Sequence, residues 1–365
     1  MNKRQILLGV YRYGIALIIG TLVGSLFIAA KGEDPIFAYK VLVEGAFVGR
    51  AAVAQTLRWA TPAILSGLAV TLAFRAGVSN MGVEGQLYVG ALVSAMVGYS
   101  ISLPPVIHTV FALLCGGLAG AAWALVPAYL KMKFGINEIV NTLMLNYVAS
   151  LFTEYLVRVF IMGSSAAAVP SQVVTPQIAV TATLPKLMPP YQANIGLVLG
   201  IFMAVALYTF FRRTVKGYEL DLAGRNPSFV QYGGVDVKKL TFSAFLASGF
   251  IGGLVGAVEI LGVHYKFAAQ FSSNLGFDGL LIALLARLNP LAVIPVGFLW
   301  GALRNGAYTM ERMTSVSRMV IQVVQALFVL FITVDSGTIS VVLEKVFRVR
   351  RTGLGTEEMK GGIQG

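Results

Sequence analysis

Long apolar stretches separated by short polar segments run along almost the whole chain. A membrane-spanning helix needs about 20 predominantly apolar residues, with a range of about 17–25. Two neighbouring stretches, Leu275–Ala286 and Leu291–Leu303, are too short for two ordinary crossings, and we interpret them as half-helices that meet at Asn289-Pro290. The predicted full spans are Tyr13–Ala30, Ala51–Phe74, Gln86–Ile101, Val106–Leu130, Ile139–Met162, Asn194–Phe211, Thr241–Val263 and Met319–Val334.

The composition agrees with this pattern: 57% of the residues are hydrophobic, 12% are charged and the mean hydropathy is +0.78. Soluble domains carry about 25% charged residues, so this chain cannot cover a water-facing surface. We predict an all-α polytopic membrane protein with about eight spanning helices plus the broken or re-entrant pair. Residues 1–350 form a single transmembrane domain in this interpretation, and the glycine-rich tail 351–365 is disordered and cytoplasmic.

The first apolar segment, Tyr13–Ala30, has two interpretations. It follows Lys3 and Arg4 and ends in Ala29-Ala30, which resembles a cleavable signal peptide. Its apolar run is long for such a peptide and many spans follow it, so we favour an uncleaved first helix.

Basic residues outnumber acidic ones by 28 to 16, which gives a net charge of +12. They are scattered between apolar segments and are not clustered with aromatic residues, so nucleic acid is not an expected partner. An excess of Lys and Arg marks cytoplasmic loops. With the N-terminus inside, 18 of the 28 fall on the cytoplasmic side, six of them in the loop Arg212–Leu240. We therefore expect a cell-membrane protein with both termini in the cytoplasm.

The residues that usually carry catalysis or metal binding are scarce. Cys115 is the only cysteine in the sequence, which excludes an internal disulfide and a thiolate metal cage. The two histidines, His108 and His264, lie beside expected helix ends, where we interpret them as interfacial side chains with one wet edge. The sequence has no Gly-xxxx-Gly-Lys-Ser/Thr phosphate loop, no His-Glu-xx-His and no Gly-x-Ser-x-Gly. We expect no catalytic residues, no cofactor, no metal and no ATP hydrolysis by this chain itself.

A weak internal repeat joins two distant parts of the chain. Gly82-Val-Glu84-Gly85 and Gly276-Phe-Asp278-Gly279 are each followed by a similar apolar pattern, and each comes after a glycine-rich span. The preceding spans run in opposite directions in the predicted topology. Two inverted repeats with broken helices near the bilayer midplane would produce this arrangement.

Polar residues near or within the apolar segments are candidates for a substrate path, because an intramembrane polar group must face protein or water. Glu84 and Asp278 have an alternative role, since a carboxylate in the first turn of a helix is stabilised by the helix dipole. For the asparagines the alternative role is hydrogen bonding between helices. Asn137 and Asn141 lie on one face of their helix, and Asn146 faces away from them. The predicted path comprises Asn80, Glu84, Gln86, Asn137, Asn141, Asp278 and Asn289. Other polar positions are Asn146, Glu154, Glu259 and Arg287.

Four stretches resemble the membrane permease subunits of ATP-binding-cassette importers in the ribose and branched-chain amino acid class, most closely the nucleoside or simple-sugar members. They run in order from about residue 50 to about residue 335. The resemblance implies a second permease, cytoplasmic ATPases and an extracytoplasmic substrate-binding lipoprotein as partners. The stretches are Phe74–Gln86, Gly135–Tyr147, Ala223–Pro227 and Gly276–Pro295.

The same resemblance implies that the ATPase docks on a short helix in a cytoplasmic loop, and Arg212–Leu240 is the matching loop. Asn226-Pro227 is a suitable helix start and Gly233-Gly234 a suitable end. The alternative is a solvated turn. Ser228-Phe229 and Ala286 depart from the small residues and the glycine that are usual in the family. The predicted docking residues are Arg225, Asn226, Pro227, Phe229, Tyr232 and Gly233.

The function that follows is import of a neutral polar solute, a nucleoside in the first place, with a simple sugar or a branched-chain amino acid as alternatives. An ion-coupled secondary transporter is the competing class, because inverted repeats occur there too. An intramembrane enzyme is disfavoured, because no nucleophile is paired with a base.

Overall fold

The computed structural model describes residue 18, residues 20–162 and residues 173–333. Within them the chain is helical, with two isolated β-bridges and no longer strand pairing. The main helices are α2 (Pro35–Phe47), α3 (Arg50–Arg75), α4 (Val83–Ser100), α5 (Ile107–Phe134), α6 (Glu138–Leu156), α7 (Gly196–Arg213), α8 (Val215–Arg225), α9 (Pro227–Tyr232), α10 (Val237–Glu259), α11 (Leu275–Leu285), α12 (Pro290–Met313) and α13 (Met319–Thr333).

Two compact units are present, and each is considered by itself. One comprises residues 33–318 and therefore α2 to α12. The other comprises residues 1–32 and 319–365, of which the described part holds an apolar helix at Gly20–Ala30 and α13. The start of the predicted first span and the tail 351–365 lie outside the described residues, and both stay predictions.

Five helices in the described part are long and apolar enough to cross a membrane: α3, α5, α6 with the π-turn that follows it, α7, and α10 with its own π-turn. The prediction of an all-helical membrane protein is thereby confirmed. The predicted number of about eight crossings is more specific than these helices establish, and it stays a prediction.

The predicted length of the second half-helix, Leu291–Leu303, is wrong. The first, α11, has 11 residues, and α12 begins at Pro290, at the predicted junction of the two half-helices. The Asn289 side chain, predicted for the substrate path, caps α12. However, α12 continues for 24 residues, well past Leu303. The apolar pattern stops at Arg304, whereas the helix does not, because Arg304 forms an ion pair with Asp278 inside the protein. A charge that faces a partner leaves the backbone hydrogen bonds of the helix intact.

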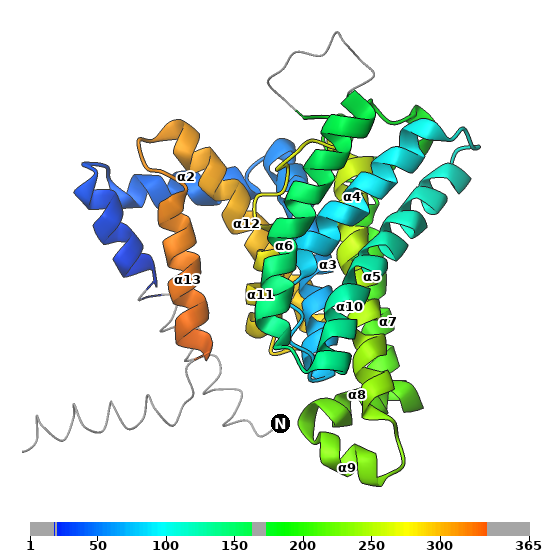
Figure 1. Ribbon diagram of the computed structural model, residues 1–365. Coiled ribbons are helices and arrows are strands. Elements are labelled where there is room, and N and C mark those ends of the chain that lie inside the picture. The colour runs from blue at the N-terminus through cyan, green and yellow to red at the C-terminus, as the bar shows by residue number, and fades with distance from the viewer. Residues whose placement is uncertain (1–17, 19, 163–172, 334–365) are drawn as a thin grey trace, which may run out of the picture. The chain divides into compact units, whose positions relative to one another are not determined.

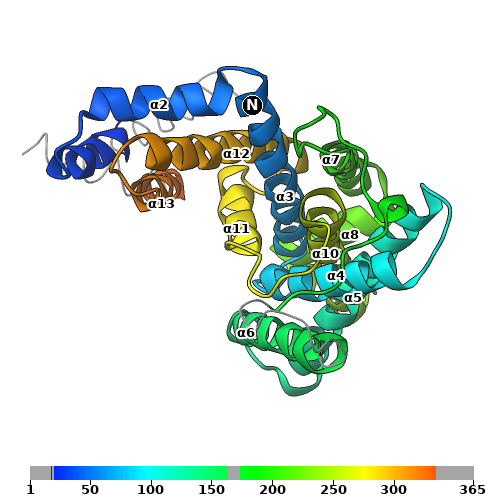
Figure 2. The ribbon, with the colours of Figure 1, turned by 90° about the horizontal axis from the view of Figure 1, so that it is seen from above.

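The helices α3 and α10 form the centre of the larger unit (Figure 2), and 83% of the most apolar part of each is buried. The same share is 33%, 22% and 28% in α5, α6 and α7, whose outer faces carry exposed apolar side chains. Helix α10 packs on α3, α4 and α5, while α12 packs on α2 and α3. Apolar residues on the outside of such a bundle face lipid, whereas most of α3 and α10 is kept away from it by the surrounding helices.

Glycines allow the central helices to approach closely. Gly116 and Gly120 of α5 lie against Gly253 of α10, and Gly90 of α4 lies against the same residue. A Cβ atom at any of these positions would meet the backbone of the neighbouring helix. Gly116 and Gly120 are four positions apart, and small residues at this spacing let membrane helices pack closely.

His108 differs from its predicted interfacial position. Its side chain is fully buried, with Nδ1 2.8 Å from Thr181 Oγ1 and Nε2 3.2 Å from the carbonyl oxygen of Val97. The segment 173–195 folds back over the start of α5 and covers the ring, which the local sequence around His108 does not reveal.

Candidate functional site: a polar cavity among three central helices

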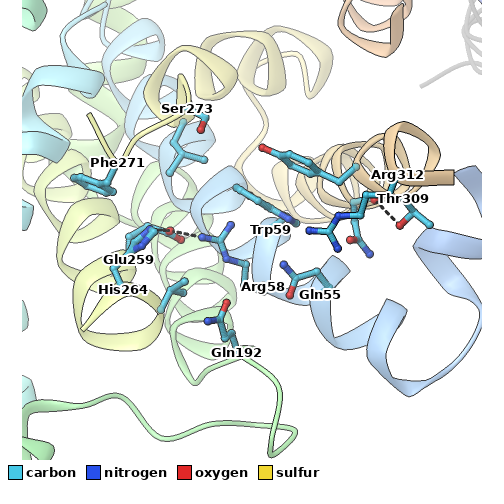
Figure 3. A pocket seen from close by; sticks show the side chains of 14 residues that line it. Gln55, Arg58, Trp59, Gln192, Glu259, His264, Phe271, Ser273, Thr309 and Arg312 are labelled. Carbon is cyan, nitrogen blue, oxygen red and sulfur yellow. Dashed lines mark hydrogen bonds and ion pairs between the residues drawn. The ribbon is translucent and has the colours of Figure 1, made fainter. Parts of the chain in front are cut away.

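A cavity of about 440 Å³ opens between α3, α10 and α12. Its volume lies in the range of about 300–1,000 Å³ that is common for small-molecule sites. Three aromatic rings, several amide and hydroxyl groups, and charged side chains share its wall (Figure 3). The lining includes Gln55, Arg58, Trp59, Gln192, Glu259, His264, Phe271, Ser273, Asn305, Tyr308, Thr309 and Arg312.

A buried ion pair crosses from α3 to α10 at the wall of this cavity. Arg58 Nη2 donates to Glu259 Oε2 at 2.9 Å, and the two side chains are 5% and 1% exposed. His264 Nε2 lies 3.5 Å from the same carboxylate oxygen. One charge within a bilayer costs about 2.5–3.5 kcal/mol on insertion scales. Each member of the pair therefore depends on the other.

Trp59 is held by cations and by a second ring. The guanidinium carbon of Arg58 lies 3.6 Å from the centre of the Trp59 ring and that of Arg304 lies 4.4 Å from it. The Tyr308 ring stacks on Trp59 with centroids 5.5 Å apart. Arg304 also pairs with Asp278 and donates from Nη2 to the carbonyl oxygen of Ser273 at 2.7 Å. Contacts from α3, α11 and α12 thus fix one rigid aromatic wall.

The cavity suits an uncharged solute with hydrogen-bonding groups. The two most buried charges in its lining, Arg58 and Glu259, are already paired, so a ligand does not have to neutralise them. Among the described residues, Arg58 Nε and Nη1 and Glu259 Oε1 have no hydrogen-bond partner. These atoms are enclosed, and both side chains belong to the wall of the cavity. Amide and hydroxyl groups from Gln55, Gln192 and Ser273 supply further donors and acceptors.

The two halves of the predicted repeat meet behind this cavity. Glu84 is 6% exposed and its Oε2 accepts a hydrogen bond from the backbone nitrogen of Gly276 at 2.6 Å. A Cβ at Gly276 would meet the backbone of Glu84, and a Cβ at Gly279 would meet Ser66. Glu84 therefore caps the opposite helix, α11, as well as lying in the first turn of its own helix. Since Leu275 and Ser273 line the cavity, this contact positions its wall.

Asn80 and Gln86 belong to a separate buried network. Asn80 Nδ2 donates to Ser248 Oγ at 2.8 Å, and Gln86 Nε2 donates to Asn80 Oδ1 at 3.2 Å. The two side chains are 0% and 1% exposed. Asn146 supports the same region, because its Oδ1 accepts from the backbone nitrogen of Gly85 and its Nδ2 donates to the carbonyl oxygen of Met81. These groups fix the start of α4.

The remaining predicted path residues lie at helix ends. Asn137 and Asn289 are exposed and cap α6 and α12 through hydrogen bonds from Ile139 and Leu291. Asn141 is half-buried, and its Nδ2 has no partner among the described residues. None of the seven predicted path residues lines the cavity; Glu84 and Asp278 act on its wall from behind.

At the other end of α10, α8 and α9 form a helical extension below the bundle (Figure 1). As predicted, α9 begins at Pro227, with the Asn226 side chain accepting a hydrogen bond from the Phe229 nitrogen at 3.0 Å, and ends before Gly233. Its aromatic residues point outward: Phe229 is 61% exposed and Tyr232 is 93% exposed. Val230 is buried against the rest of the unit. The helix thus presents an aromatic surface on a polar loop.

The described residues contain no group of three histidine, cysteine, aspartate or glutamate side chains that could hold a metal ion. They do combine helices long and apolar enough to span a membrane with a polar cavity of ligand size, the two features that an integral membrane transport protein requires.

The chain belongs to the family described as branched-chain amino acid transport system / permease component, whose model matches residues 52–332. It is a transport subunit embedded in a membrane.

Relatives match most of the chain. The guanosine ABC transporter permease protein NupP of Bacillus subtilis is 34% identical over 87% of this chain and 91% of its own length. The glucose ABC transporter permease protein TsgB13 of Haloferax volcanii is 32% identical over 87% of this chain and 85% of its own. The nucleoside ABC transporter permease protein NupB of Lactococcus lactis is 27% identical over 88% and 89%. No solved structure matches the chain.

One feature of the sequence could have identified two of the cavity residues. Arg58 and Glu259 are single opposite charges within two different apolar segments, and two such charges are stable only as a pair. Trp59, Phe271 and Tyr308 carry no comparable signal, because aromatic residues are common throughout a membrane protein.

Proposed function

We propose that this chain is the permease subunit of an ATP-driven importer for nucleosides. The observation that carries the proposal is the family membership together with the likeness, over almost the whole chain, to permeases named for guanosine and for nucleosides. The cavity supports it, since aromatic rings and neutral hydrogen-bonding groups complement a base and a sugar. A simple sugar is the second candidate, favoured by the similar relative named for glucose.

The solute enters the cavity between α3, α10 and α12 in this proposal. Arg58 and Trp59 belong to the first half of α3, and Glu259 and His264 lie at the end of α10. These positions are at the opposite end of the helices from Arg75 and α8. With α8 and α9 in the cytoplasm, as the basic residues predict, the cavity opens toward the extracytoplasmic side.

The proposed partners are a second permease, identical or related, a cytoplasmic ATP-binding-cassette ATPase that hydrolyses ATP, and an extracytoplasmic substrate-binding lipoprotein. Phe229 and Tyr232 support an ATPase contact at α9, because exposed aromatic residues are frequent anchors in protein interfaces. Arg225, Asn226, Pro227 and Gly233 shape and flank this helix.

We propose further that α4 and α11 are equivalent helices of two inverted repeats. Both helices begin at a Gly-x-acid-Gly motif, and the two motifs touch through Glu84 and Gly276. Helices of this kind start near the bilayer midplane in many transporters and rock against each other during transport.

Uptake of radiolabelled nucleosides by the reconstituted complex tests the function. We expect guanosine and other nucleosides to compete with one another and transport to stop when ATP is removed. Transport that continues without ATP and stops when an ion gradient is dissipated would assign the chain to the secondary transporters. Competition by glucose but not by nucleosides would select the sugar.

Site-directed labelling tests the orientation. In a Cys115→Ala background, a cysteine at Val180, which is 86% exposed, should react with an impermeant reagent from outside. A cysteine at Lys239, 86% exposed at the start of α10, should react only from inside. The reverse result would place the cavity on the cytoplasmic side.

A further inference from the structure

Four arginines from separate parts of the chain surround a second cavity, at the end of the bundle where α3 and α7 stop. Its volume is about 390 Å³. Arg75 is the last residue of α3, Arg212 lies in the last turn of α7, Arg225 ends α8, and Arg287 follows α11. Because up to 212 positions separate them in the sequence, the fold and not a local basic run brings them together.

The lining carries an excess of positive charge. Asp221 is the one carboxylate among its residues, against four guanidinium groups. Arg75 Nη2 lies 2.5 Å from Asp221 Oδ1, and Arg225 Nη2 lies 2.9 Å from Asp221 Oδ2. A single carboxylate thus bridges two of the arginines. Like charges that converge on one cavity repel one another unless an anion lies between them.

Aromatic rings and an unusual backbone hold the cations in place. Arg75 lies over the Phe211 ring at 4.3 Å, and Arg212 lies over the Tyr208 ring at 5.5 Å. Arg287 and Leu288 have φ values of +50° and +55°, in the left-handed region that residues with a side chain rarely adopt. Both line the cavity. Backbone of this kind occurs often at ligand-binding sites, where the surrounding structure maintains it.

We propose that this cavity binds a phosphate group, carried either by an anionic lipid headgroup or by a soluble phosphate compound. The fork of a guanidinium group matches phosphate oxygens with two parallel hydrogen bonds. The site lies where two apolar helices, α3 and α7, end, which is the level of lipid headgroups. It is separate from the solute cavity and from the exposed rings of α9, so the inference does not depend on which solute is transported.

Lipid and phosphate binding by the full-length chain in detergent tests this proposal. The probes are phosphatidylglycerol, phosphatidylcholine with the same acyl chains, and inorganic phosphate, with binding followed by native mass spectrometry and by the shift in Tm. We expect phosphatidylglycerol to bind on the order of tenfold more tightly than phosphatidylcholine, as a few charge-assisted hydrogen bonds would produce. The Arg212→Gln/Arg287→Gln variant should lose this preference.

Two further variants keep the test specific. Arg213→Gln removes the neighbouring charge on α7, which does not line the cavity, and should retain the preference. Arg212→Lys retains the charge without the fork and should bind more weakly than the native chain, even if the double variant fails to fold. A rise in Tm with inorganic phosphate as large as that with the lipid, which the same variants abolish, would support the site with a soluble phosphate compound as its ligand. The proposal would be overturned if the native chain bound both lipids equally and inorganic phosphate did not shift its Tm. It would also be overturned if Arg213→Gln lost the preference for phosphatidylglycerol as fully as the double variant.

Discussion

The Arg58–Glu259 pair and the Arg225–Asp221 pair consist of the same chemical groups in opposite surroundings. Arg58 and Glu259 are 201 positions apart, join α3 to α10, and are 5% and 1% exposed. Arg225 and Asp221 are four positions apart within α8, and are 73% and 19% exposed. The first pair depends on the tertiary structure, whereas the second is compatible with α8 alone.

The difference lies in what happens when one partner is lost. Removal of one charge from a buried pair leaves the other without compensation and costs about 3–5 kcal/mol. Loss of Arg225, the exposed partner of a pair four positions apart, costs about 0.3–0.5 kcal/mol, because water replaces its guanidinium group and Asp221 retains Arg75 as a partner. Stability and transport should therefore respond together at the cavity and separately in the helical extension formed by α8 and α9.

Glu259→Gln is expected to have the largest effect. The amide cannot balance the buried Arg58 charge, so the free energy of unfolding should fall by about 3–5 kcal/mol and uptake should be lost. Glu154→Gln is the matched control, since its pair with Arg158 is 24% and 65% exposed. Equal thermal stability of the two variants in detergent would contradict the role assigned to the buried pair.

Replacement of both partners sharpens this test. Arg58→Met combined with Glu259→Met removes the charges together and should recover most of the lost stability. Uptake that stays low in this stable variant would assign the pair to solute binding, whereas recovered uptake would restrict it to helix packing.

Phe229→Asp is expected to abolish ATP-dependent uptake without a loss of stability. An aromatic anchor in an interface contributes about 2 kcal/mol or more, so affinity for the ATPase should fall at least about 30-fold. A 61% exposed position tolerates the charge in the isolated chain, and the free energy of unfolding should stay within about 0.5 kcal/mol. Phe229→Trp, which preserves the ring, should remain coupled. ATPase affinity that does not change in Phe229→Asp would exclude α9 as the docking helix.

Two substitutions of Glu84 distinguish a structural role of its carboxylate from a contact with the solute. Glu84→Ala leaves the buried Gly276 nitrogen without its acceptor and should cost about 1–3 kcal/mol. Glu84→Gln offers an amide oxygen to the same nitrogen and should cost only about 0.3–1 kcal/mol, with near-normal uptake. A loss of uptake on the order of tenfold in Glu84→Gln at unchanged stability would show that the carboxylate contacts the solute.

The smallest effect is expected at Asp236, the exposed cap of α10. A hydrogen bond from the Lys239 backbone nitrogen lowers the pKa of the Asp236 carboxyl below its usual value. The cap therefore stabilises α10 at a pH above the unfolded-state pKa, and this contribution is lost as the pH falls through the lower folded-state value. Protection of the amides at the start of α10 from hydrogen exchange, measured relative to the intrinsic rate at each pH, should fall over that acidic range in the native chain. It should remain constant in Asp236→Asn, which caps without titrating. A native chain without this pH dependence would contradict the carboxylate cap.

The sequence alone was sufficient for features that depend on local preference. The start of α9 at Pro227 and of α12 at Pro290 follows from the fixed φ of proline and the capping amide before it. The membrane class follows from the lack of charge over long apolar stretches. The length of α12 was not predictable in this way, because the charge that interrupts its apolar pattern is neutralised by Asp278 of another helix.

The cavity is a product of the tertiary structure. The seven polar residues that the sequence singled out stand beside glycines or near helix ends, which are local signals. In the fold Asn137 and Asn289 cap helices, and Glu84 and Asp278 support the wall from behind. Asn80 and Gln86 form a separate buried network, whereas Asn141 Nδ2 has no hydrogen-bond partner among the described residues. Arg58, Trp59, Glu259 and Tyr308 become a site only when three helices come together. The sequence by itself determined that charges within apolar segments need partners, since water is absent there. Only the packing of α3 on α10 and α12 decided which charges pair and where a space remains between them.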